Sequence, residues 1–104
     1  MNKTEQLVGL PAYAESRLAN DPPLRAVRAF EAIARLGSVT LAAQELDISP
    51  SAVSHQLRVL EGYLQMPLTE RQGRRLVLSQ HGREYYRSIR AAFNVLRQAT
   101  EHLA

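Results

Sequence analysis

The pair Ser49-Pro50 constrains the fold more than any other feature of the sequence, because it fixes where a helix begins. A serine side chain accepts a backbone N–H bond at an N-cap, and a proline at the first helical position gives up a donor that would have no partner. The residues that follow carry an apolar stripe spaced by four, three and four positions, namely Val53, Leu57, Leu60 and Leu64. This spacing predicts an amphipathic helix over about residues 50–64.

A short helix is predicted just before this one, joined to it by a tight turn. Ser38 suits an N-cap, and the helix that it opens extends over about residues 39–46. Its inner positions, Ala42 and Ala43, are small and allow another helix to approach closely. We expect Ile48, in the turn, to enter the core. A short alanine-containing helix, a tight turn and a second amphipathic helix form the helix-turn-helix arrangement.

The flanking segments complete a small, mainly α domain. Residues 24–36 have the apolar spacing of a helix, with a stripe of Leu24, Val27, Phe30, Ile33 and Ala34. Residues 68–78 predict a two-stranded hairpin, with Gln72-Gly73 at the turn and with Leu76 and Leu78 pointing inward. The expected fold class is therefore a winged helix-turn-helix, with a three-helix core and a two-stranded β wing.

A long helix is predicted after Ser79, which suits its N-cap. Its apolar positions alternate in steps of three and four, as in a heptad seam: Tyr86, Ile89, Phe93, Leu96, Thr100 and Leu103. Because such a helix overhangs a domain of this size, we expect it to pair with a second helix. The predicted organisation is a flexible tail over 1–23, the winged domain over 24–78 and a dimerisation helix over 79–104.

Charge divides unevenly along the 104 residues. Residues 1–48 carry five basic and six acidic side chains, a net charge of −1. Residues 49–104 carry eight arginines and four glutamates, a net charge of +4. Arginine offers a planar fork that suits phosphate oxygens and guanine edges, so a polyanionic partner is plausible. With no apolar run long enough to span a membrane and no apolar leader, we expect a cytoplasmic protein without a membrane partner.

The sequence gives no sign of catalysis. The chain has no cysteine, which excludes disulfides, thiolate metal sites and a cysteine nucleophile. Its three histidines, His55, His81 and His102, are far apart in the sequence, so we expect no metal site. No Ser-His-Asp order, glycine-rich phosphate loop or carboxylate pair stands out. We therefore expect neither enzyme activity nor a cofactor.

Taken together, the motifs resemble a known family. The run Leu24–Gly82 is similar to the N-terminal winged helix-turn-helix domain of LysR-type bacterial transcription regulators. The matching stretches are Arg28-Ala29-Phe30, Gly37 to Ala43, Ser51 to Leu57, Leu60-Glu61, Pro67-Leu68, Glu70-Arg71 and Gly73 to Arg75. The opening Pro23-Leu24 with Ala29 to Ala32 is similar to the branch that contains the glycine-cleavage activator and the β-lactamase regulator.

The resemblance implies a role for individual positions. The helix over about 50–64 would be the recognition helix in the major groove, and the arginine-bearing hairpin would contact the backbone or the minor groove. The residues so implicated in DNA binding are Thr40, Pro50, Ser51, Ser54, His55, Arg58, Arg71, Arg74 and Arg75. The helix after Ser79 would pair antiparallel with its copy, giving a homodimer on double-stranded DNA with an interrupted palindromic site.

The sequence departs from the family pattern at three points. Position 55, often arginine in the family, is histidine here, which is shorter and carries a conditional charge. Position 69, commonly bulky and apolar, is Thr69, which we expect to loosen the seat of the wing. Family members also continue into an effector-binding domain of roughly twice this length, which this chain lacks. The chain is either a fragment that ends after the linker helix or a naturally short regulator.

A second function class stays open beside sequence-specific DNA binding. The winged core could serve as a scaffold, with the last helix forming mixed dimers with a longer relative and so inhibiting it. The exposed heptad without a sensor domain motivates this alternative.

Overall fold

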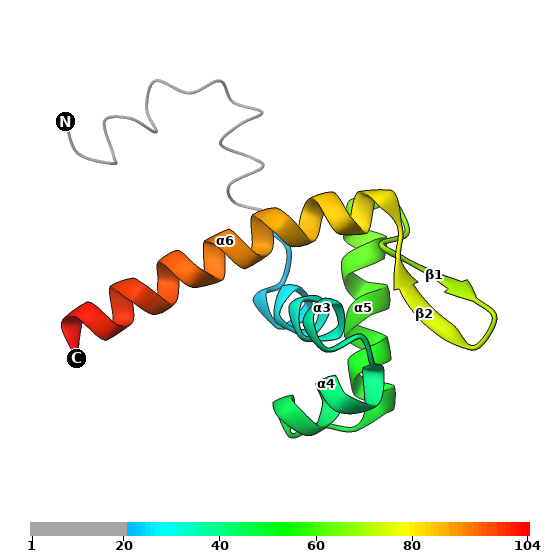
Figure 1. Ribbon diagram of the computed structural model, residues 1–104, viewed down its shortest axis with the longest axis horizontal. Helices are drawn as coiled ribbons and strands as arrows, with labels where there is room; N and C mark the ends of the chain where they lie inside the picture. Colours follow the sequence, from blue (N-terminus) through cyan, green and yellow to red (C-terminus); the bar gives the residue numbers. More distant parts are fainter. Residues whose placement is uncertain (1–20) are drawn as a thin grey trace.

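The computed structural model describes residues 21–104. Its elements are α3 (Leu24–Leu36), α4 (Val39–Leu46), α5 (Pro50–Leu64), β1 (Thr69–Gln72), β2 (Arg75–Leu78) and α6 (Gln80–Leu103), as Figure 1 shows. The predicted flexible tail over 1–23 lies, up to residue 20, outside the described residues. Among the described helices, none has both the length and the apolar character needed to cross a membrane.

Three serines begin helices as the sequence predicts, and a glycine ends the first described helix. The Oγ atoms of Ser38, Ser49 and Ser79 each accept a backbone N–H bond three residues further on, at 3.0 to 3.1 Å. Gly37 ends α3 in the left-handed conformation, with φ of 68°. These caps satisfy donors that a helix start leaves without partners, and Ser38 after Gly37 turns the chain directly into α4.

Helix α3 lies at the centre of the core and packs against α4, α5 and α6. The largest fully buried side chains are Phe30, Val53, Leu60 and Leu68. Ala42 and Ala43 are buried, so α4 approaches its neighbours closely, as the small side chains predict. Two predicted core positions are wrong: Leu24 is 67% exposed and Ile48 is 43% exposed. Leu24 is the first residue of α3, and Ile48 lies in the turn that follows the left-handed Asp47 after α4. Both therefore lie at the ends of the packed helices, where neighbouring elements do not cover them.

The hairpin forms with its turn one residue later than predicted. Gln72 pairs with Arg75, so Gly73 and Arg74 are the two central residues of the turn. Gly73 has a φ of 64°, and Arg74 has no positive φ. A positive φ at the first central residue alone is the pattern of a type II′ turn, which suits the twist of a hairpin and favours glycine at that place. Leu76 and the other inward residues of β2 are half-buried against the core.

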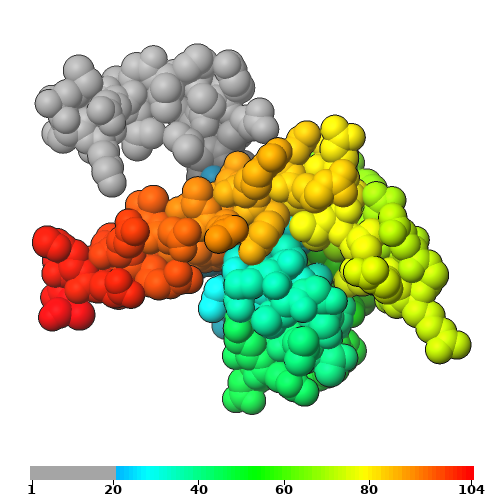
Figure 2. All heavy atoms as spheres, in the orientation of Figure 1, coloured from blue at the N-terminus to red at the C-terminus, as the bar shows by residue number. Residues whose placement is uncertain are grey.

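Helix α6 divides into two parts with different surroundings. Its first part crosses α3, where Tyr86, Ile89 and Phe93 are partly buried against the core of the same chain. Its second part projects beyond the domain, as the end of the red segment shows in Figure 2. Leu96 and Leu103 there are 55% and 88% exposed.

Candidate nucleic-acid interface

The polar face of α5 is free of the core. Pro50, Ser51, His55 and Arg58 are exposed, while Ser54 is half-buried. Residues 51, 54, 55 and 58 recur at intervals of three and four, so they share one side of the helix. The opposite side holds Val53 and the other buried residues of the helix. This arrangement anchors α5 on one face and leaves short polar groups accessible near its N-terminus.

One of these polar groups has a local partner. The Ser51 and Ser49 Oγ atoms are 3.1 Å apart and share a hydrogen bond. Ser49 Oγ also accepts from the Ala52 N–H. The cap therefore holds the Ser51 hydroxyl at the start of the helix, and Ser54 and His55 have no hydrogen-bond partner for their side chains within residues 21–104.

Thr40 is exposed in the first turn of α4. The position of α4 relative to α3 is held by an ion-pair network. Arg35 donates to Glu31 within α3, with Nε to Oε2 at 2.8 Å, and to Glu45 on α4. The hydrogen bond with Arg35 lowers the pKa of Glu45, and those with Glu31 and Glu45 raise the pKa of Arg35. Sequence reasoning missed this link, since residues ten positions apart give no local signal.

The three wing arginines are all exposed, but they do not form one cluster. Arg71 lies opposite Leu76, and Arg75 lies opposite Gln72. These two pairs are neighbours along the hairpin. Because directly opposed residues share a face and neighbours along a strand alternate, Arg71 and Arg75 point to opposite faces. Arg74 lies in the turn itself. The three arginines are therefore spread over the hairpin, with one at the tip and one on each face.

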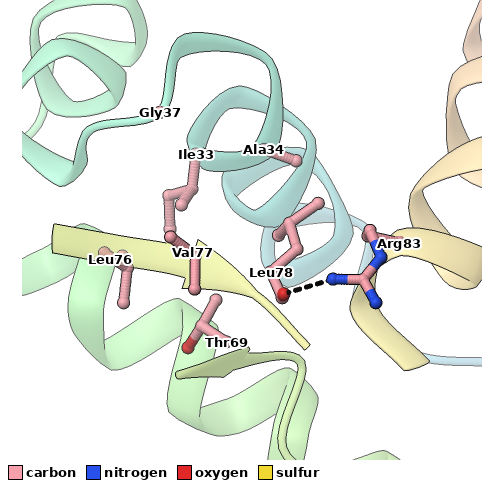
Figure 3. A pocket seen from close by; sticks show the side chains of 8 residues that line it. All are labelled: Ile33, Ala34, Gly37, Thr69, Leu76, Val77, Leu78 and Arg83. Carbon is pink, nitrogen blue, oxygen red and sulfur yellow. Dashed lines mark hydrogen bonds between the residues drawn. The ribbon is translucent and has the colours of Figure 1, made fainter. Parts of the chain in front are cut away.

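The wing is seated on the C-terminal part of α3. Thr69, Leu76 and Leu78 line a hollow of about 340 Å³ together with Ile33 of α3. Figure 3 shows these side chains. Leu78 O accepts from Arg83 Nη1 of α6 at 3.1 Å, drawn there as a dashed line. These contacts fix the base of the hairpin, while its tip extends away from the body of the domain, as Figure 2 shows.

Glu61, on the last turn of α5, is a second residue that sequence reasoning did not single out. Its Oε2 accepts from the Leu68 N–H at 2.7 Å and lies 3.4 Å from the Thr69 N. The carboxylate therefore joins α5 to the start of the wing. The signal available in the sequence was the pair Leu60-Glu61 within the family motif, which carries no information about a partner seven residues away.

The predicted dimer residues fall into two groups. Tyr86, Ile89 and Phe93 are half-buried within their own chain, and Phe93 also stacks under the Arg28 guanidinium, 5.6 Å from its ring centroid. Leu96, Thr100 and Leu103 are exposed. Among the predicted dimer residues, those exposed in the single chain therefore lie in the last part of α6.

These elements define a winged helix-turn-helix domain, with an exposed polar helix face beside a basic hairpin. Residues 24–83 match the family model described as "Bacterial regulatory helix-turn-helix protein, lysR family". The chain belongs to this family, which confirms the resemblance predicted from the motifs.

Similar proteins support the same assignment. The chain is 44% identical over 82 residues to the glycine cleavage system transcriptional activator of Escherichia coli K12, covering 79% of this chain and 27% of that protein. It is 46% identical over 80 residues to the RuBisCO operon transcriptional regulator of Allochromatium vinosum, covering 77% of this chain and 26% of that protein. The chain thus spans about a quarter of the length of the relatives it matches.

Solved structures share the fold. A probable transcriptional regulator from Pseudomonas aeruginosa superposes with a TM-score of 0.73 at 34% identity, over 79% of this chain and 28% of that one. The BenM DNA-binding domain, solved in complex with benA site 1 DNA, superposes with a TM-score of 0.72 at 28% identity. That match covers 78% of this chain and 91% of the BenM domain.

Proposed function

We propose that this domain binds double-stranded DNA sequence-specifically as the DNA-reading part of a LysR-type regulator. The observation that carries the proposal is the exposed polar face of α5, anchored from behind by Val53, Leu57 and Leu60. A helix held this way can enter the major groove without rearrangement of the core, and short side chains near its N-terminus allow close approach to base edges. Such a regulator acts in the cytoplasm, where bacterial DNA lies.

Each predicted contact residue has a distinct part in this proposal. Ser54 and His55 face base edges, Pro50 and Ser51 allow the helix start to approach, and Arg58 lies toward the phosphates. Thr40, in the first turn of α4, contacts the backbone. Arg74 at the tip of the wing, with Arg71 or Arg75 on one face, contacts phosphates or the minor groove.

The domain acts as a homodimer in this proposal. The exposed apolar residues at the end of α6 pair with those of a second copy, and two recognition helices then read two half-sites of an interrupted palindrome. The supporting observation is that Leu96 and Leu103 lie on one exposed stripe with no partner in the described chain. The alternative, mixed dimers with a longer relative, uses the same stripe and does not require DNA contact by this chain.

Selection of binding sites from random duplex DNA, followed by a salt titration, tests the proposal. A motif with two related half-sites and a steep loss of affinity with salt is the expected result. Salt-sensitive binding without any motif would contradict sequence-specific reading and favour the mixed-dimer function.

A further inference from the structure

The start of the wing is tied to α5 by one side chain. Glu61 Oε2 accepts from the Leu68 N–H at 2.7 Å, and the Thr69 N and Oγ1 atoms lie 3.4 and 3.5 Å from the same oxygen. Within residues 21–104, no other side chain of α5 forms a hydrogen bond to the hairpin. Because the acceptor is a carboxylate and the shortest bond is to a buried segment, this link is stronger than a bond between neutral groups.

The other end of the wing is tied to a different helix. Ser79 follows β2 and begins α6, and its Oγ donates to Pro67 O at 3.0 Å. Its N–H donates to Leu68 O at 2.9 Å. The hairpin is therefore held between two helices, by Glu61 on the α5 side and by Ser79 on the α6 side.

We propose that Glu61 is a positioning residue for DNA binding, which couples the wing to the recognition helix. This inference rests on the proposed function, since it assigns Glu61 to the contact between the wing arginines and DNA. Glu61 does not itself touch the nucleic acid. It fixes the base of the hairpin relative to α5, so that the tip arginine reaches the backbone while the polar face of α5 lies in the major groove.

The physical reason is preorganisation. Without the carboxylate, the start of the first strand would lose its side-chain hydrogen bonds to α5. The hairpin would then be held by Ser79 and by its apolar residues on the core, and it would sample more orientations relative to α5. Ordering it again on DNA would cost conformational entropy and lower the affinity gained from its arginines. Thr69 contributes to the same link, so a threonine at this position adds a polar contact in place of the apolar bulk common in the family.

A double-mutant cycle tests the coupling. The duplex with the highest affinity in a random-sequence selection serves as the probe. Affinity is measured for the 104-residue chain, for Glu61→Ala, for a wing variant with Arg71→Ala, Arg74→Ala and Arg75→Ala, and for all four changes together. We expect Glu61→Ala to weaken binding roughly fivefold, the scale of one hydrogen bond, in the intact wing. In the wing variant, the same change should weaken binding by less than about twofold.

Three controls separate positioning from stability. Glu61→Gln keeps an acceptor oxygen at the same place and should restore most of the affinity. If Glu61→Ala does not fold, Glu61→Asp keeps the charge but shortens the reach, and it replaces alanine in the cycle. Val59→Ala, on the same helix and packed against the core, lowers stability but keeps the Glu61 hydrogen bonds to the wing, and it should leave affinity unchanged.

Two results would overturn the inference alone. One is an equal loss from Glu61→Ala with and without the wing arginines. The other is an equal loss of affinity from Val59→Ala at matched stability. A wing variant that binds as tightly as the wild type would reject the wing contact and this inference together, while leaving recognition by α5 intact. Failure to select any site would reject the proposed function and the inference with it.

Discussion

The backbone of Leu68 lies against Gly82 so closely that a Cβ atom on Gly82 would be 2.0 Å from the Leu68 carbonyl oxygen. Gly82 is in the first turn of α6, and the same carbonyl accepts a hydrogen bond from the Ser79 N–H. A glycine is required here by space and not by backbone conformation. This close approach lets α6 begin directly on the segment that leads into the wing.

We predict that Gly82→Ala destabilises the domain by about 1–3 kcal/mol, because the atom it would meet belongs to the backbone and moves only with the start of the wing. Gly62→Ala is a matched control, since Gly62 is helical, exposed and has nothing within 4 Å of an added Cβ. That change should stabilise by about 0.5–1 kcal/mol through helix propensity. Urea unfolding followed by circular dichroism measures both, and equal effects of the two changes would show that α6 can shift.

The helix-turn-helix was predictable because its signals are local. Ser49-Pro50 fixed the start of α5, and the 4-3-4 spacing of its apolar residues fixed its buried face. The errors arise where burial depends on what packs nearby. Leu24 is apolar and in helical register, and Ile48 is apolar and lies in a turn. Both side chains line a groove of about 660 Å³ and do not enter the core.

The candidate site was predictable in part, for the same reason. A residue type and its helical spacing placed Ser51, Ser54, His55 and Arg58 on one exposed side. The part played by Glu61 was not predictable, because its partners are set by the path of the chain after α5. Spacing also could not show that the heptad stripe of α6 divides, with its first part packed on its own domain.

The folded domain should become less stable in acid, because the Arg35–Glu45 ion pair is lost when Glu45 is protonated. Its hydrogen bond from Arg35 lowers the pKa of the Glu45 carboxyl below its ordinary value of 4.5. Because the pKa of Glu45 is lower in the folded chain than in the unfolded chain, the ionised carboxylate stabilises the fold at pH values above 4.5. This stabilisation is lost as the pH falls through the pKa that Glu45 has in the folded chain. Thermal unfolding of the wild type and Glu45→Gln between pH 7 and pH 3 should therefore converge at low pH. A constant difference between them across this range would contradict the prediction.

Changes on α5 and on the wing should weaken DNA binding in different ways. Ser54→Ala or His55→Ala should lower discrimination at particular base pairs by about 1–3 kcal/mol, if a base contact is lost. Arg74→Ala should weaken all sequences alike and reduce the slope of affinity against salt by about one. Titrations of the selected duplex and of single-base variants over several salt concentrations measure both effects. Equal losses from all three changes on all sequences would contradict this division of roles.

Dimerisation should depend on the projecting end of α6 and not on its packed part. Leu96→Ser with Leu103→Ser removes apolar surface that is exposed in the single chain, so the variant should remain folded and become monomeric. Ile89→Ser, by contrast, replaces a side chain packed against the core and should lower the free energy of unfolding. Sedimentation velocity gives the oligomeric state, and thermal unfolding at a fixed low concentration gives the stability. A double variant that stays dimeric would place the dimer contact outside the end of α6. DNA affinity measured on the same samples would then show whether both half-sites of the selected duplex are still bound by one dimer.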